Sequence, residues 1–86
     1  MALDESIRLG DRELAEMFAG NIEAERFPPI LTLSQAAELL QIPVGTLRDW
    51  RSRGLMPGCS RKVGKHVRYF RDRLVKHLFN RGLREE

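Results

Sequence analysis

Five potential cations lie within eight residues of this chain, on both sides of Gly64. They are Arg61, Lys62, Lys65, His66 and Arg68. Lysine and arginine neutralise phosphate groups, and arginine also gains from the negative potential of a narrow minor groove. A solvated turn would explain two such residues, but five favour a phosphate-binding surface. Lys62 and Lys65 are placed to bind phosphate, whereas Arg61 or Arg68 is the better candidate for insertion into a groove.

The net charge of +3 conceals an asymmetry between two parts of the chain. Residues 1–29 contain seven acidic residues and three arginines, whereas residues 30–86 contain twelve lysines and arginines and five acids. A basic segment behind an acidic one indicates a polyanionic partner. Charge alone fits a solvated basic surface equally well.

The sequence lacks the residue types and spacing of a catalytic or metal site. It contains no Ser/His/Asp arrangement, no paired carboxylates and no glycine-rich phosphate loop at useful spacing. Cys59, His66 and His77 are too few and too widely spaced for zinc. We expect both histidines on the surface and Cys59 to be an unactivated loop thiol. The sequence therefore predicts a protein that is not an enzyme and has no metal or cofactor.

The consecutive prolines after Phe27 mark the clearest boundary, because they interrupt a helix. Residues 1–29 are expected to form an acidic, partly helical arm, residues 30–82 a folded domain, and residues 83–86 a tail. Within the arm, Asp11 is a plausible N-cap and Gly20-Asn21 a plausible stop. The apolar face of that helix would contain Leu14, Met17 and Phe18, with Leu3 and Ile7 as an extension on an earlier turn.

Two short amphipathic helices are predicted next, from Leu33 to about Gln41 and from about Val44 to Arg53. Thr32 and Gln35 have the spacing of a capping box, and Pro43 suits the start of the second helix. The buried positions are expected to be Leu33, Ala36, Ala37 and Leu40 in the first helix, and Leu47 and Trp50 in the second. Helices this short, separated by about three residues, are typical of a helix-turn-helix.

A β-hairpin and a closing helix complete the predicted domain. Residues 60–63 and 66–70 are β-prone runs around Gly64-Lys65. One of Tyr69 and Phe70 should enter the core, and the other should pack against the last helix. That helix would be capped by Asp72 and ended by Gly82, with Leu74, Val75, Leu78 and Phe79 buried. The predicted fold class is mainly α with a small hairpin: a winged helix-turn-helix preceded by an N-terminal accessory helix.

About fifty residues in one register resemble the excisionase-type helix-turn-helix domain, a relative of the MerR DNA-binding domain. The resemblance is carried by Leu31-Thr32, Ala36-Ala37, Leu39-Leu40, Thr46-Leu47-Arg48 with Trp50, Gly54 with Pro57, and the basic hairpin around Gly64. Three positions depart from the family pattern. Pro43 replaces a small capping residue, Gln41 stands where glycine is frequent, and Arg73 stands where aspartate commonly precedes a leucine, so that the last helix is capped by Asp72 or not at all.

The resemblance implies binding to double-stranded DNA, with the second helix as the recognition helix. Its expected contact residues are Gly45, Thr46, Arg48, Asp49, Arg51, Ser52 and Arg53, with backbone contacts from Thr32, Ser34 and Gln35. Arg48 would read a base, contact a phosphate or pair with a neighbour. Asp49 would orient Arg48 or Arg53, or accept from cytosine. Gly45 either lets the start of the helix approach a DNA phosphate closely or is simply tolerated near a helix end.

The sequence leaves three roles open for the protein. The chain is expected to act as an excisionase-like recombination directionality factor or phage or mobile-element regulator, as a MerR-like transcription regulator without an effector domain, or as an adaptor. The arm would bind an integrase, a part of the transcription machinery or a second copy, or fold back to enlarge the core. The absence of a long apolar run favours the cytoplasm and the nucleoid over a membrane.

Overall fold

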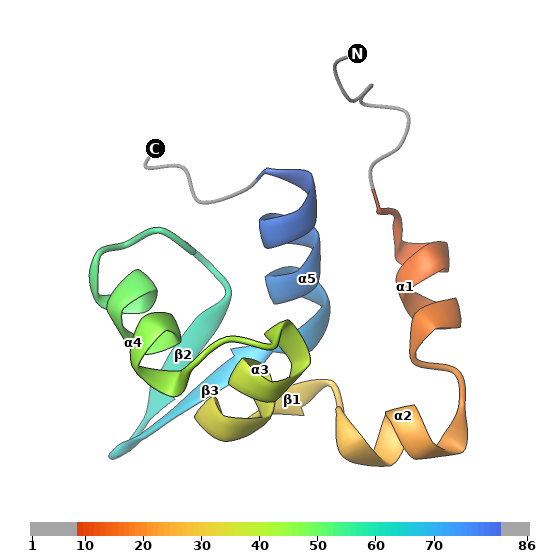
Figure 1. Ribbon diagram of the computed structural model, residues 1–86, viewed down its shortest axis with the longest axis horizontal. Helices are drawn as coiled ribbons and strands as arrows, with labels where there is room; N and C mark the ends of the chain where they lie inside the picture. The colour runs from red at the N-terminus through yellow and green to blue at the C-terminus, as the bar shows by residue number, and fades with distance from the viewer. Residues whose placement is uncertain (1–8, 82–86) are drawn as a thin grey trace.

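The computed structural model describes residues 9–81. Figure 1 shows the order of the elements in this part of the chain. They are α1 (Asp11–Met17), α2 (Asn21–Arg26), β1 (Ile30–Leu31), α3 (Leu33–Leu40), α4 (Val44–Ser52), β2 (Ser60–Val63), β3 (His66–Phe70) and α5 (Arg71–Asn80). The predicted class is confirmed: a mainly helical small domain with a helix-turn-helix and a β-hairpin.

The helix-turn-helix consists of α3 and α4. The backbone N–H of Gln35 donates to Thr32 Oγ1 at 3.1 Å, and the Thr32 N–H donates to Gln35 Oε1 at 2.9 Å. The predicted capping box is therefore confirmed, and it satisfies two amides that the first turn of a helix leaves without partners. Ala36, Ala37 and Leu47 are buried where the two helices meet.

The turn between these helices places Gln41 in the left-handed region, with φ of 58°. Its N–H donates to the Glu38 carbonyl, and the N–H of Ile42 donates to the Ala37 carbonyl, so two carbonyls in the last turn of α3 are satisfied. Pro43 then serves as the N-cap of α4, where its missing N–H costs nothing.

The hairpin belongs to a three-stranded antiparallel sheet in the order β1-β3-β2. The sequence predicts β2 and β3, but β1 was missed. In β1, Ile30 pairs with Phe70 and Leu31 with Tyr69. Leu31 and Tyr69 are fully buried, whereas Phe70 is only half-buried on the other face of the sheet.

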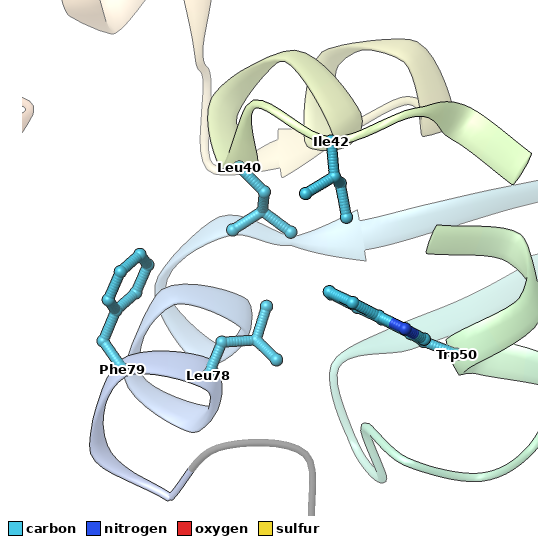
Figure 2. Close-up of a pocket in the computed structure, with 5 residues that line it drawn as sticks. All are labelled: Leu40, Ile42, Trp50, Leu78 and Phe79. Atoms are coloured by element: carbon cyan, nitrogen blue, oxygen red, sulfur yellow. The ribbon is translucent and has the colours of Figure 1, made fainter. Parts of the chain in front are cut away.

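One core cluster joins α3, α4, the sheet and α5. Its fully buried side chains include Leu31, Ala36, Leu47, Tyr69 and Leu74. Trp50, expected to be buried in the core, packs against this cluster and is half-buried. Figure 2 shows Leu40, Ile42, Leu78 and Trp50 around a hollow of about 190 Å³, with Phe79 beside them.

Helix α5 differs from the prediction at its start and on one face. Its N-cap is Phe70, without a side-chain cap, and Asp72 lies in the first turn and pairs with Arg71 at 2.9 Å. Leu74 and Val75 are buried as predicted, but the expectation of a buried Phe79 is wrong, because its side chain is 68% exposed. Gly82, the predicted stop, lies outside the described residues.

The arm folds back along α5, and α1 and α5 lie side by side in Figure 1. Leu14 and Phe18 form a second core cluster with Val75. Met17, predicted on the same face, is half exposed, and Gly10 replaces Asp11 as the N-cap. The stop at Gly20-Asn21 is instead the beginning of α2, which the sequence did not predict.

The predicted extension of the arm's apolar face at Leu3 and Ile7 lies outside the described residues. Between residues 9 and 81, no helix is long and apolar enough to span a bilayer.

Candidate nucleic-acid interface

Helix α4 presents a polar face to solvent, because only Leu47 on this helix is fully buried and Trp50 is half-buried. With these two side chains turned inward, the period of 3.6 residues places the predicted recognition residues on the other faces. Of these, Thr46 and Arg51 are half-buried, and the exposed ones are Gly45, Arg48, Asp49, Ser52 and Arg53.

Asp49 holds Arg53 rather than Arg48. Its Oδ2 lies 3.4 Å from Arg53 Nη1, and its backbone carbonyl accepts from Ser52 Oγ at 3.1 Å. Of the two arginines expected as partners of Asp49, Arg53 is the one that it contacts. Arg48 has no hydrogen-bond or ion-pair partner among residues 9–81, so its guanidinium faces solvent from the middle of α4.

Arg51 links α4 to the base of the hairpin. Its Nε donates to Ser60 Oγ at 3.1 Å. Ser60 pairs with Tyr69, which is fully buried. Burial raises the pKa of the Tyr69 phenol, while the nearby charges of Arg51 and Arg48 lower it. These contacts fix the position of the hairpin relative to α4, a link that the sequence alone did not predict.

The hairpin divides its cations between its two faces. Lys62 pairs with Val67, two residues along from the Ser60–Tyr69 pair, so these side chains share the face that α4 approaches. Arg61 lies opposite Arg68 on the other face, beside Phe70, as does His66 opposite Val63. Lys65 occupies the tip. The structure therefore separates cations that the sequence placed on one surface.

The start of α3 holds the three remaining predicted residues. Ser34 is exposed, whereas Thr32 and Gln35 are half-buried and use their side chains in the capping box. The Thr32 hydroxyl accepts the Gln35 N–H, which leaves its own proton free for another acceptor.

His77 and Cys59 are both more buried than the sequence suggested. The expectation of a surface His77 is wrong: the residue is 9% exposed, and its Nε2 lies 3.1 Å from the Leu55 carbonyl oxygen. The expected surface position of His66 is confirmed. Cys59 is buried in the core, and burial raises the pKa of its thiol, which agrees with the expected lack of activation.

Arg71 is a structural residue that the sequence analysis missed. Its Nη1 donates to the Phe27 carbonyl at 2.8 Å, its Nε to Asp72 Oδ1 at 2.9 Å, and its guanidinium lies 4.0 Å from the centre of the Phe18 ring. A single buried cation thus joins the arm to α5. The sequence pattern carries no signal for this role.

Comparison with known proteins agrees with this geometry. The family model described as a helix-turn-helix domain matches residues 30–81, which is more than half of the chain. No curated protein and no solved structure matches the chain significantly. The matched residues contain the capped α3, the turn at Gln41, α4, the hairpin and α5. The chain therefore belongs to the helix-turn-helix domain family of excisionase-like proteins, and its partner is DNA.

Proposed function

We propose that this protein binds a specific sequence of double-stranded DNA, with the N-terminal half of α4 in the major groove and the hairpin against the adjacent backbone. The observation that carries the proposal is the polar face of α4, where Arg48 is exposed and has no partner among residues 9–81, while Lys62 lies on the hairpin face that α4 approaches. The N-terminal residues of a recognition helix normally contact base edges. Domains of this helix-turn-helix family are typically not enzymes.

Each residue of this surface has a proposed role. Arg48 reads guanine, a contact that discriminates between bases by about 1–3 kcal/mol. We place Thr46 and Asp49, which are one turn apart, near the base edges as well, where Asp49 keeps Arg53 directed along the helix. We assign phosphate contacts to the side chains of Ser34, Thr32, Gln35, Arg51, Ser52, Arg53, Lys62 and Lys65. Of the remaining hairpin cations, Arg61, His66 and Arg68 reach DNA only if the tip enters the minor groove with both faces in contact.

Gly45 lies in the first turn of α4, where amide groups face outward and a phosphate can approach. A Cβ placed there would meet nothing within 4 Å in the protein. We assign Gly45 to close approach of the DNA backbone, because no packing within the chain requires a glycine at this position.

Within this DNA-binding role, we favour an excisionase-like factor that directs a recombinase, because the matching family is excisionase-like. The alternative is a small transcription regulator. Immunoprecipitation of the protein with sequencing of the bound fragments separates them. Repeated sites beside an attachment sequence are the expected result, and sites confined to promoters would support the regulator instead. Sites without a shared sequence would contradict specific binding altogether.

A further inference from the structure

The outer face of the sheet, on the opposite side from Tyr69, carries apolar residues that the fold leaves uncovered. Ile30 is 56% exposed, Val63 is 60% exposed and Phe70 is half-buried. These three apolar residues line a shallow hollow of about 360 Å³ together with three basic ones, Arg61, His66 and Arg68. An exposed apolar patch with a polar rim is typical of a protein-binding surface.

The outer face of the sheet is also positively charged. Arg61 and Arg68 lie directly opposite each other across the hairpin, and like charges in that position repel. Arg73 adds a third guanidinium, 5.1 Å from the centre of the Phe70 ring. A carboxylate partner placed between these arginines would relieve the repulsion. The face is therefore suited to an acidic segment that also carries an apolar side chain.

Helix α2 has that chemistry. None of its residues is buried, and Ile22, at 76%, is the most exposed large apolar side chain in the part of the chain described. Glu23 and Glu25 follow it on the same helix and are exposed as well. A helix of six residues that buries nothing gains little stability from its own sequence, so its exposed face is available for a partner.

The same chain cannot bring these two surfaces together. Arg26 pairs with Glu38 on α3, and the Phe27 carbonyl is held by Arg71, so both contacts fix the end of α2 in place. Figure 1 shows α2 beyond β1, at the end of the molecule away from the hairpin tip. Contact between α2 and the outer face therefore requires two molecules.

We infer that α2 of one copy docks on the outer face of the sheet of a second copy, with Ile22 in the hollow and Glu23 and Glu25 beside Arg61 and Arg68. Because the two surfaces differ, the contact is head-to-tail. An assembly of any length therefore has an unoccupied α2 at one end and an unoccupied sheet face at the other, so that further copies can add. The contact does not depend on DNA binding, so its failure would leave the proposed function standing.

Sedimentation velocity of the full chain without DNA tests this contact. The wild-type protein is expected to form dimers and larger species as its concentration approaches about 1 mM, and less so at high salt. Ile22→Asp or Ile30→Asp should lower the association constant at least about tenfold, because each places a charge in an apolar contact. Phe79→Asp is the matched control, since it changes an exposed apolar residue elsewhere and should leave association unchanged.

Mixing the variants tests the head-to-tail geometry. Ile22→Asp retains a complete sheet face and Ile30→Asp retains a complete α2, so the mixture should form a one-to-one dimer and nothing larger. If Ile22→Asp proves unstable, the double variant with Glu23→Arg and Glu25→Arg is used in its place. A wild-type protein that stays monomeric would overturn the inference. So would association that is lost in Phe79→Asp, or association that survives in both isoleucine variants.

Discussion

Two arginines one turn apart on α4 have different surroundings, and this difference assigns their roles. Arg51 is half-buried and donates to Ser60, so it positions the hairpin even though its terminal nitrogens can still reach a phosphate. Arg48 is exposed and has no partner among residues 9–81. Arg48 is therefore the arginine whose loss should affect base reading without loosening the domain.

At Gly45, stability and DNA affinity are expected to change in opposite directions. Gly45→Ala should stabilise the protein by up to about 1 kcal/mol, because alanine favours a helix and a Cβ has room there. The same Cβ should weaken DNA binding if a phosphate approaches this backbone. Thermal unfolding and binding titrations of the variant measure both effects. Higher stability with unchanged affinity would show that Gly45 is merely tolerated.

At the scale of elements, the turn between α3 and α4 holds one residue in a strained backbone conformation, and a substitution can relieve that strain. Gln41 adopts φ of 58°, a conformation that costs a residue with a Cβ about 1–2 kcal/mol. Glycine adopts it freely but loses more entropy on folding. The fold thus keeps a glutamine at a position that favours glycine.

Gln41→Gly should therefore raise the free energy of unfolding by about 0.5–1 kcal/mol. Gln41→Ala is the control, because alanine keeps the Cβ and should bring no such gain. Urea denaturation of the three proteins gives the comparison. If the glycine and alanine variants prove equally stable, the turn is not strained.

Local signals made most of the elements predictable. Thr32 and Gln35 form the predicted capping box because the motif involves neighbouring residues only. β1 was missed because two residues carry no periodicity, and Leu31 pairs with Tyr69 far along the chain. His77 was misplaced for a similar reason, since it is buried against the carbonyl of Leu55, which lies 22 residues away in the chain. The sequence pattern could not predict contacts between segments that are far apart in the chain.

The candidate site was predictable by residue type but not by face. Alternation along a strand implies that Arg61 and Lys62 point to opposite sides of the hairpin. Which side faces α4 depends on the contact between Arg51 and Ser60, and the sequence gives no indication of it. The division of the hairpin cations therefore emerged only from the three-dimensional arrangement.

At the scale of the whole molecule, Leu9 and α1 of the acidic arm are fastened to α5. Leu9 exchanges two hydrogen bonds with the Asn80 side chain, at 2.7 and 3.0 Å, and Lys76 donates to Asp11 at 2.8 Å. The hydrogen bond and charge of Lys76 lower the pKa of Asp11. This contact therefore contributes stability above the ordinary pKa of aspartate and loses it as the pH falls through the lowered value.

Arg71→Met should loosen the arm and lower the free energy of unfolding by about 2–3 kcal/mol, because it removes the hydrogen bond to the Phe27 carbonyl and the contact with Phe18. Urea denaturation gives the stability, and limited proteolysis should show faster cleavage within residues 9–29. Asp72→Asn, which removes only the exposed partner of Arg71, should cost less than about 1 kcal/mol. Similar costs for both variants would refute this role of Arg71.

The central claim is that α4 reads bases while the hairpin holds the backbone. Its most direct test is the affinity of the wild type, Arg48→Ala and Lys65→Ala for a selected site and for random duplex over a range of salt. Arg48→Ala should lose about 1–3 kcal/mol for the selected site and much less for random duplex. Lys65→Ala should weaken both and reduce the salt slope by about one. Equal losses from both substitutions on both duplexes would contradict the claim.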